Sequence, residues 1–555
     1  MSKKLLSFLL FLILIFVIWP LFVPGFFTHH DNLQVIRVYE MKKCLLDLQI
    51  PCRWVPDMGY GYGFPLFNYY APFAYYLGGL LSFVFGYITS VKILFLLTFI
   101  LSFLGMYLLT KEFFGVWAAI FSSVLFTYAP YRALDVYVRG ALAEIFAISL
   151  VPFIFYFVYK LSQKKEKKYF LGLVISLTSF FLSHNVMVML FSPLIIIWMI
   201  LVYLYKKGLG LKILLVSLFI SLGVSSFFLL PAFFEKNLVQ IESMTKDELN
   251  FRAHFVKVSQ LFWDRSWHYS ASNPQQEDTI SFQVGWPHWF IVFLSLPFIT
   301  FYIVKKKKLD LGFLLSLFMF FVFVFSIFMT HNKSAFIWER IPILSFTQFP
   351  WRFLSLSIFS SSIIGGFFIS HLAGLGVKNF RWFFIFIVLL TIFLNYRYFR
   401  PERFFKTSDK EILSGESFRT MQRGSINDYL PVGAVVPDSP APLQLSRVDD
   451  GIVVSNFNLK TDSWSFLVKA EREGKVEVPV FNFPVWEVKS GNKFLNYETS
   501  DKGLVIVNLP RGGYMVEGRL VDTRVRRISN WISLLSLLLF VVFIRYEKAF
   551  KFFRS

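Results

Sequence analysis

The residues best suited to chemistry lie between His29 and Tyr70, directly after the first apolar segment of the chain. Aromatic belts and lysines are enough to anchor a helix at a bilayer surface, and this stretch holds more than that. A carboxylate can take a proton from a hydroxyl, and arginines bind phosphate through paired N–H donors. An active-site loop is therefore predicted from the run His29-His30-Asp31, Arg37, Pro51-Cys52-Arg53-Trp54, Gly59-Tyr60-Gly61-Tyr62-Gly63 and Asn68-Tyr69-Tyr70.

Three further groups of polar residues are predicted at the same face. Arg139 and Glu144 stand at the mouth of a predicted span, where ionisable groups pair, face the bundle interior or do chemistry. The alternative is a snorkelling arginine in a structural ion pair. His184 and Asn185 form a tight turn between two predicted spans, where a histidine can also be a simple helix cap. Arg352 can clamp a lipid phosphate or be one residue of an interfacial belt.

A long polar and aromatic region at 235–287 offers rings together with carboxylates and arginines, as in Phe262-Trp263-Asp264-Arg265 and Gly285-Trp286-Pro287. Such surfaces suit sugars, because the C–H faces of a pyranose stack on rings. An interfacial tryptophan belt explains the same residues equally well.

Both cysteines of the chain, Cys44 and Cys52, fall in the first outer loop. Thiols outside the cytoplasm can oxidise, so a disulfide across Ile50-Pro51 would tie this loop together. Two buried thiols are the alternative, and both readings stay open at this point.

Composition places the chain in a membrane. The 555 residues are 56% hydrophobic and include 72 phenylalanines, and repeated apolar runs of about 20 residues are what a bilayer demands. The first run follows Lys3-Lys4 like a signal peptide, but no small-residue cleavage site comes after it, so a retained span is predicted. Twelve spans are predicted at 5–24, 89–110, 116–131, 143–160, 169–183, 186–205, 211–232, 287–304, 311–329, 353–373, 382–398 and 528–545.

The distribution of charge predicts the orientation. With both termini in the cytoplasm, the predicted cytoplasmic segments hold 21 basic and four acidic residues, which is +17 of the net charge of +21. This excess follows the positive-inside rule, so it indicates orientation in the plasma membrane and no nucleic-acid partner. The candidate residues then lie on the outer face.

Two segments of the first outer loop, 25–88, are predicted to be helices in the outer interface. Residues 65–86 are apolar enough to span, but a thirteenth span would turn every later lysine cluster outward. Pro65, Pro72 and Gly78-Gly79 also interrupt this segment. Residues 32–48 carry apolar side chains near helical spacing and are predicted to be a second interfacial helix.

Residues 399–527 differ from the rest of the chain, because their basic and acidic residues nearly balance. Alternating valines at 476–480 and 505–507, with glycine turns near 491 and 512, predict a small β-sandwich displayed outside. The predicted organisation is a transmembrane domain at 1–398, this β-domain, and a final span with a basic tail at 528–555. No metal-ligand spacing, phosphate-binding glycine loop or nucleophile elbow occurs in the sequence.

The motifs resemble a known family of membrane proteins, called 6-pyruvoyl-tetrahydropterin synthase-related. The resemblance covers roughly residues 25–360 and rests on Asp31…Arg37, Pro51-x-Arg53-Trp54, Gly59-Tyr60-Gly61, Phe67-Asn68-Tyr69-Tyr70-Ala71-Pro72, Arg139-Gly140-x-x-x-Glu144, His184-Asn185 and Gln348-Phe349-Pro350-Trp351-Arg352-Phe353. The tail, with Pro484-x-Trp486 and Leu509-Pro510-x-Gly512, resembles the outer β-domain of large bacterial membrane glycosyltransferases. No zinc-binding histidine set of the soluble pterin enzymes is present.

The resemblance implies the C-type glycosyltransferase (GT-C) fold, with an acid in the first outer loop and a polyprenyl-phosphate sugar as donor. Asp31 is then expected to be the catalytic base, and Arg139 and Arg352 the ligands of the departing phosphate. Substrate binding is expected of the remaining residues, His30, Arg37, Tyr69, Tyr70, Glu144, His184 and Asn185. No certain cofactor is predicted: a divalent metal stays open but is not indicated, since Asp31 is followed by Asn32 where some such enzymes have a carboxylate pair.

The expected reaction is transfer of a sugar to a hydroxyl of a glycan, lipid or protein acceptor, with inversion. Two other classes remain open. A polytopic transporter or flippase should have ionisable residues at mid-bilayer depth and broken spans in matching halves. A non-catalytic glycan-binding scaffold would give no reason for Asp31, Arg139 and Arg352 to come together.

Overall fold

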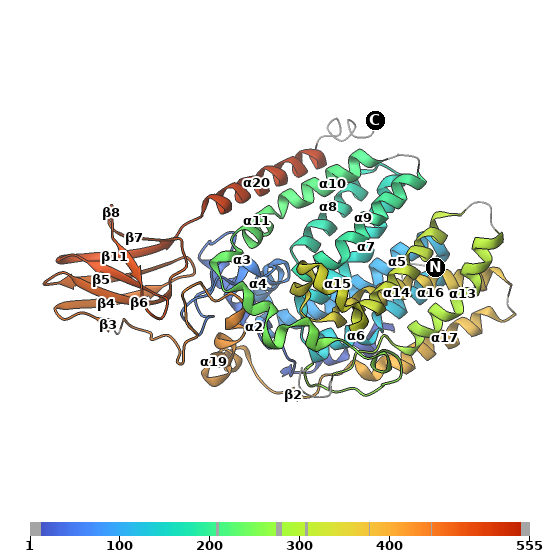
Figure 1. The fold of residues 1–555 in the computed structure, drawn as a ribbon, viewed down its shortest axis with the longest axis horizontal. Helices are drawn as coiled ribbons and strands as arrows, with labels where there is room; N and C mark the ends of the chain where they lie inside the picture. The colour runs from blue at the N-terminus through green and yellow to red at the C-terminus, as the bar shows by residue number, and fades with distance from the viewer. Residues whose placement is uncertain are drawn as a thin grey trace.

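The protein consists of a helical body with a group of strands projecting from one end (Figure 1). The structure is a computed structural model and describes residues 13–206, 210–272, 280–305, 309–376, 378–445 and 447–545. The last helix returns from the strands along one flank of the body. The prediction of a polytopic helical membrane protein with a C-terminal β-domain is confirmed.

Within the described residues, eight helices are long and apolar enough to cross a membrane. Each coincides with at least one predicted span, because runs of about 20 apolar residues are the plainest signal in the sequence. The helices are α5 (Tyr87–Thr127), α7 (Leu142–Gln163), α9 (Asn185–Tyr205), α13 (Trp286–Lys305), α14 (Leu311–Thr330), α16 (Leu354–Gly374), α17 (Phe380–Asn395) and α20 (Arg524–Arg545).

Gly115 divides α5 into two helices. Its φ of 84° lies outside the helical region and suits a residue without a side chain. The Ser123 hydroxyl donates to the Phe103 carbonyl at 3.1 Å, although twenty residues of straight helix would separate them by about 30 Å. The two halves therefore fold back on each other, as the separate spans predicted at 89–110 and 116–131 require.

The remaining predicted spans are also helical. The span predicted at 5–24 is described from residue 13 and forms an apolar helix, Ile13–Phe22, while α8 (Lys167–Phe181) is fifteen residues long. Helices α10 (Leu211–Val224) and α11 (Ser226–Phe234) meet at a bend of 67°. Twelve membrane crossings stay a prediction. Several of the predicted cytoplasmic basic residues lie outside the described residues: Lys3, Lys4, Lys207, Lys306 to Lys308, Lys548, Lys551 and Arg554.

The first outer loop contains the two predicted helices, α2 (Gln34–Leu46) and α4 (Phe73–Phe85), with the short α3 (Leu66–Tyr69) between them. Helix α4 packs closely on α2 at Gly78, where a Cβ atom would lie 2.7 Å from a methyl group of Val38. The opposite face of α4 exposes Leu80 and Val84. An exposed apolar face is what a helix in the membrane interface needs, and that placement remains a prediction.

Reporter fusions test this topology. A reporter fused after residue 88 should report the extracytoplasmic side, and one fused after Lys165 should report the cytoplasm, because lysine-rich segments stay inside. Paired alkaline phosphatase and green fluorescent protein fusions measure the two outcomes. A cytoplasmic signal at residue 88 would contradict the assignment, since it would place Asp31 in the cytoplasm.

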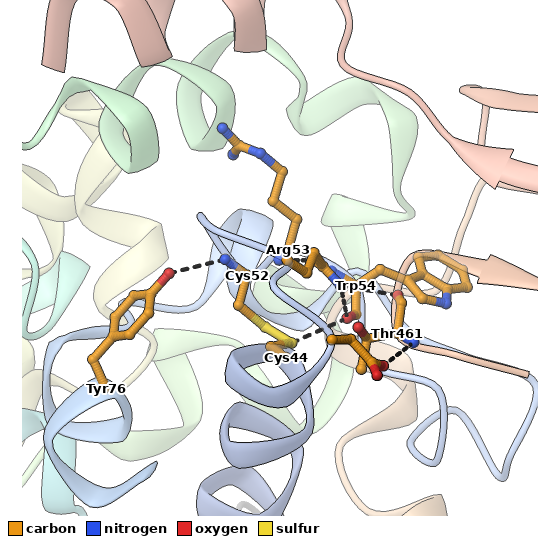
Figure 2. Close-up of a disulfide and its surroundings, with 8 residues drawn as sticks. Cys44, Cys52, Arg53, Trp54, Tyr76 and Thr461 are labelled. Atoms are coloured by element: carbon orange, nitrogen blue, oxygen red, sulfur yellow. Dashed lines mark hydrogen bonds between the residues drawn. A yellow bond between two sulfur atoms is a disulfide. The ribbon is translucent and has the colours of Figure 1, made fainter. Parts of the chain in front are cut away.

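A disulfide between Cys44 and Cys52 closes the end of α2, so the oxidised alternative holds in the structure (Figure 2). The enclosed turn contacts the β-domain through Gln49. Its side-chain amide donates to the carbonyl of Trp54 at 3.0 Å and to that of Thr461 at 2.9 Å. The closed turn therefore holds the strands against the first outer loop.

The β-domain contains two antiparallel sheets, in agreement with the predicted sandwich, and its strands begin at residue 447. Its core includes Trp464 and Trp486, both buried. One sheet has the order β3 (Arg447–Val448), β6 (Gly474–Phe481), β10 (Leu504–Leu509) and β9 (Tyr497–Thr499). The other has the order β4 (Ile452–Leu459), β5 (Ser463–Ala470), β11 (Gly512–Leu520), β7 (Trp486–Ser490) and β8 (Lys493–Phe494).

The segment between α17 and the first of these strands lies against the helical body. Strand β2 (Phe404–Phe405) pairs with β1 (Phe26–Phe27) at the start of the first outer loop. Asp409 accepts hydrogen bonds from the first two amides of α5, at 2.7 and 2.9 Å, and so caps that helix. The segment continues through α18 (Asp409–Ile412) and α19 (Gly415–Arg423). It thereby brings residues far along the chain to the first loop.

A buried polar cluster joins the last helix to the same loop. Glu235, directly after α11, accepts from Arg526 of α20 at 2.9 Å and from Asn68 of α3 at 3.0 Å. Arg53, which points away from the disulfide in Figure 2, donates to Asn68 at 3.2 Å and to Asn530 at 2.8 Å. Glu235 and Arg526 are both buried, so each needs the other for charge compensation.

Candidate active site

A cavity of about 380 Å³ lies at the end of the bundle that carries the first outer loop. Asp31, Arg139 and Arg352, which were predicted to approach one another, all line it. Nine of the ten predicted site residues are in the lining: His30, Asp31, Arg37, Tyr70, Arg139, Glu144, His184, Asn185 and Arg352. The exception is Tyr69.

Asp31 lines the cavity, and one of its two oxygens is held in a fixed network. Its Oδ2 accepts from the Arg37 guanidinium at 2.7 Å and from the Gln34 amide at 2.8 Å. Its Oδ1 has no hydrogen-bond partner among the described residues, and the side chain is 29% exposed. Asp31 does not cap α2, which begins at Gln34 without a side-chain cap. The carboxylate is thus oriented by two donors and retains a basic oxygen.

Backbone pairing places Asp31 beside Arg139. The amides of His30 and Asp31 donate to the carbonyls of Val138 and Arg139, at 2.9 and 2.8 Å. Gly140 follows with a φ of 68°, and a Cβ atom there would lie 2.6 Å from the His29 ring. The close approach of these two segments therefore requires glycine at position 140.

Glu144 is the centre of a buried charged network. Its Oε2 contacts the Arg139 guanidinium at 2.9 Å and Nε of Arg352 at 3.3 Å, while the Tyr131 hydroxyl donates to its Oε1. Arg139 also forms an ion pair with Asp135. Buried charges in such contact stabilise one another, and removing one partner leaves the others uncompensated. The predicted ion pair of Arg139 and Glu144 is thus present inside the cavity wall.

Two of the three cavity arginines, Arg139 and Arg352, differ in how far carboxylates already satisfy them. Arg139 is held by Asp135 and Glu144, and its guanidinium lies 4.6 Å from the centre of the Trp351 ring. Arg352 donates through one terminal nitrogen to two uncharged acceptors, the Thr347 carbonyl at 2.8 Å and the Gln348 side chain at 3.1 Å. Arg352 therefore keeps more of its charge available to an anion.

The two cavity histidines are neutral donors or acceptors. His184 caps α9, its Nδ1 accepting from the Met187 amide at 3.3 Å, so the capping alternative also holds. Burial lowers the pKa of His184 to about 3, which leaves Nε2–H as a donor at neutral pH. His30 bonds to the Tyr269 carbonyl at 2.7 Å, and burial lowers its pKa as well. Asn185 donates to the Tyr69 carbonyl at 3.0 Å.

The two tyrosines of the first loop have separate roles. Tyr70 lines the cavity, and the Arg37 guanidinium lies 4.4 Å from the centre of its ring. Tyr69 points elsewhere: its hydroxyl donates to the Glu235 carbonyl at 2.7 Å, and its ring stacks on Tyr429 at 5.4 Å. Successive residues on a short helix face different directions, which separates these neighbours.

Sequence reasoning missed four residues of the site. Asp135 and Tyr131 support Arg139 and Glu144 from the same segment, and the four-residue spacing of Asp135 and Arg139 was an available signal. Asp428 and Tyr429 complete the cavity wall from the segment after α19. No local pattern connects them with Asp31, because only the tertiary fold brings residues so distant in sequence together.

Asp428 is a second carboxyl group in the cavity. Burial raises its pKa to about 6, against the opposing effect of Arg37. An exposed aspartate titrates near pH 4, so the fold favours the uncharged form of Asp428. Asp428 is therefore mostly protonated below pH 6 and gains a negative charge as the pH rises through that value.

This titration predicts how an anionic ligand binds. Binding of a phosphate-bearing ligand should weaken by roughly tenfold between pH 5 and pH 7, because two unit charges about 12 Å apart repel by about 1.4 kcal/mol at an effective dielectric of about 20. The phosphate itself titrates near pH 6, so the relevant quantity is the difference between wild type and Asp428→Asn. In Asp428→Asn this tenfold change in affinity with pH should be absent, whereas Asp450→Asn, at an exposed position, should retain it. Identical pH profiles for wild type and Asp428→Asn would contradict the assignment.

The aromatic region at 235–287 serves mainly as a frame. Trp286 donates to the Phe262 carbonyl at 2.7 Å, and the Arg265 guanidinium lies 4.5 Å from the centre of its ring. Residues 273–279, within this region, lie outside the described residues. Only a few of its described residues reach the cavity: Met244, Leu249, Ala271, Ser272 and Ile280.

The cavity carboxylates do not form a metal-binding group. In the described part of the chain, no three or more His, Cys, Asp or Glu side chains are placed to hold one ion. Asp31 is instead engaged by Arg37 and Gln34.

The fold and the cavity define a polytopic membrane protein with a charged, arginine-rich site at one end of its bundle. The chain belongs to the family of membrane proteins with a 6-pyruvoyl-tetrahydropterin synthase related domain, whose model matches residues 67–399. Arg139, Glu144 and Arg352 lie inside the match, and Asp31 and Asp428 lie outside it. No curated protein sequence matches the chain.

Solved structures give distant similarities. ArnT from Cupriavidus metallidurans, bound to undecaprenyl phosphate, is 10% identical, with 67% of this chain and 79% of that chain covered and a TM-score of 0.33. The Archaeoglobus fulgidus oligosaccharyltransferase is 14% identical, with 71% and 55% covered and a TM-score of 0.39. The oligosaccharyltransferase AglB from Archaeoglobus fulgidus, in complex with an inhibitory peptide and a dolichol-phosphate, is 15% identical, with 71% of this chain and 55% of that chain covered and a TM-score of 0.38. The chain thus spans about half of AglB, and at these TM-scores the likeness supports no conclusion about activity.

Proposed function

We propose that the protein is a membrane glycosyltransferase of the GT-C type that uses a polyprenyl-phosphate sugar as donor. The observation that carries the proposal is the meeting of Asp31, with one unengaged carboxylate oxygen, and three arginines in one cavity. Deprotonation of a hydroxyl and stabilisation of a departing phosphate are the two tasks of this reaction. The cavity has a group for each.

The proposed reaction is a single displacement. The oxygen of an acceptor hydroxyl forms a bond to the anomeric carbon of the sugar, and the bond from that carbon to the phosphate oxygen breaks. The hydroxyl proton passes to Oδ1 of Asp31, and polyprenyl phosphate leaves with the bonding electron pair. Attack opposite the leaving group inverts the anomeric centre.

The phosphate is assigned chiefly to Arg352. One terminal nitrogen of Arg352 bonds only to uncharged acceptors, so a phosphate can bind this nitrogen without displacing a carboxylate from it. Arg139, held by two carboxylates, contributes positive potential from the wall. The Nε2–H of His184 is a further donor. The apolar lining, which includes Met244, Leu249, Phe346 and Phe349, would receive the first isoprene units of the lipid.

The remaining partners follow from the same placement. The acceptor is a hydroxyl of a glycan, lipid or protein, and Asp428 and Tyr70 are the groups placed to bind it or the donor sugar. The positive-inside distribution of charge supports a position of the cavity on the outer face of the plasma membrane. Transport or a scaffold function is supported less well, because neither needs an oriented carboxylate beside arginines at the end of the bundle.

Binding of the leaving group tests the proposal without knowledge of the sugar. Arg352→Lys keeps the charge but loses the planar fork of donors, so affinity for undecaprenyl phosphate should fall by about tenfold or more. The measurement is titration of the purified protein in lipid nanodiscs. Arg265→Lys is the matched control, because Arg265 makes similar contacts to a carbonyl and a ring outside the cavity. Unchanged affinity in Arg352→Lys would reduce Arg352 to a residue of the interfacial belt.

A further inference from the structure

A second groove, of about 570 Å³, lies beside the first half of α5 and shares no lining residue with the candidate active site. Three separate segments form it: the end of the first apolar helix at 21–25, the first turns of α5, and residues 407–409. One part of the groove is lined by apolar residues and another part by polar residues. The apolar lining consists of Leu21, Phe22, Val23, Pro24, Ile88, Ile93 and Leu96, and the polar lining of Thr89, Lys92, Thr407, Ser408 and Asp409.

Lys92 brings a positive charge into this groove without a carboxylate partner. Its ammonium group donates to the Val23 carbonyl at 2.6 Å, and no described acid lies within ion-pair distance of it. Asp409 is the one acidic residue of the lining, and both its oxygens accept from the first amides of α5. Two N–H donors of Lys92 are therefore left for an anion.

The depth of Lys92 fits a lipid headgroup. It is the sixth residue of α5, so at 1.5 Å per residue it lies about 7–8 Å along the helix from its first residue. The first outer loop and its predicted interfacial helix α4 directly precede that start. Lysines near the ends of spans place their ammonium groups at the interface, where lipid phosphates lie.

We propose that this groove binds one anionic phospholipid of the surrounding bilayer. The lipid phosphate accepts hydrogen bonds from the Lys92 ammonium, with the Thr89 hydroxyl beside it on the next turn of α5. An acyl chain lies along Leu21, Ile93 and Leu96. The groove also borders Gly25, which precedes β1, so the bound lipid packs against the segment that leads to Asp31.

Native mass spectrometry of the full chain tests the site. Protein released from nanodiscs of equal phosphatidylglycerol and phosphatidylcholine should retain one phosphatidylglycerol. Lys92→Gln should reduce its retention by about fivefold, which corresponds to about 1 kcal/mol per lysine at an anionic lipid surface. Lys92→Arg should restore retention, since it restores the charge.

Lys42→Gln is the matched control. Lys42 also donates to a backbone carbonyl, that of Ser82 at 3.2 Å, and lies over aromatic rings, but it does not line the groove. Equal losses in Lys42→Gln and Lys92→Gln, or full retention in Lys92→Gln, would overturn the proposal. A Lys92→Gln protein that kept phosphatidylglycerol but lost undecaprenyl phosphate would also overturn it, by assigning the groove to the donor. Melting curves of each variant exclude loss by unfolding.

Discussion

Replacing Asp31 with asparagine should abolish sugar transfer and leave binding of undecaprenyl phosphate nearly unchanged. Asparagine keeps the size of the side chain and can still accept from Arg37 and Gln34 through its carbonyl oxygen. It cannot take a proton, so the expected loss of rate is that of a general base, about 10²–10⁴-fold. The measurement is transfer of label from polyprenyl-phosphate monosaccharides to membrane acceptors.

Asp57→Asn is the matched control for this variant. Asp57 belongs to the same loop and pairs with Lys43, but it does not line the cavity. Transfer by Asp57→Asn should stay within a few-fold of wild type. Near-wild-type transfer by Asp31→Asn would reject the base. Loss of both transfer and lipid binding would point instead to a collapsed loop.

Replacing Glu144 with glutamine should destabilise the whole bundle. The substitution preserves the shape but removes the buried charge that compensates Arg352 and shares Arg139 with Asp135. Breaking a buried ion pair from one side costs about 3–5 kcal/mol, because the remaining charge stays buried without a partner. Thermal unfolding of the protein in detergent should therefore shift clearly downward, and transfer should be lost.

Glu112, which pairs with Lys160 at the other end of α7, provides the comparison. Glu112→Gln breaks a more exposed pair, with Lys160 at 3.0 Å, and pairs of that kind contribute about 0–1 kcal/mol. In Glu144→Gln, a second change of Arg352→Gln should recover part of the stability, since it removes the uncompensated charge. A Glu144→Gln protein that melts like wild type would show that the network is not what holds these helices together.

The fold could be predicted well where one physical signal dominates. Apolar runs of about 20 residues have few alternatives to membrane helices, and the two spans predicted at 89–110 and 116–131 match the two helices of α5 that Gly115 separates. The alternation of Val476, Val478 and Val480 likewise identified a strand. The disulfide could not be decided, because the sequence contains the two thiols but not the geometry between them.

The site could be predicted only in its local parts. Arg139 with Glu144, and His184 with Asn185, stand where spans end. Polar residues at such positions pair with each other, cap a helix or take part in chemistry, so they were recognisable as candidates. The direction of Tyr69 depended on packing against Tyr429, which no pattern at 67–72 reveals. Asp428 was missed for the same reason. Its place in the cavity depends on the segment after α19 lying against the first loop.

The buried pair of Glu235 and Arg526 has a consequence for the order of synthesis. The two residues are 291 positions apart, and at about 5–20 residues per second the ribosome needs roughly 15–60 s between them. The hydrogen bond from the Thr28 hydroxyl to the Arg403 carbonyl needs a still longer interval, because the two residues are 375 positions apart. Until α20 is made, Glu235 therefore lacks its ion-pair partner and has only the first loop, through Asn68, as a hydrogen-bond donor. The last helix therefore completes the assembly. A chain that ends before α20 keeps Glu235 without its arginine partner and lacks this contact between the last helix and the first loop.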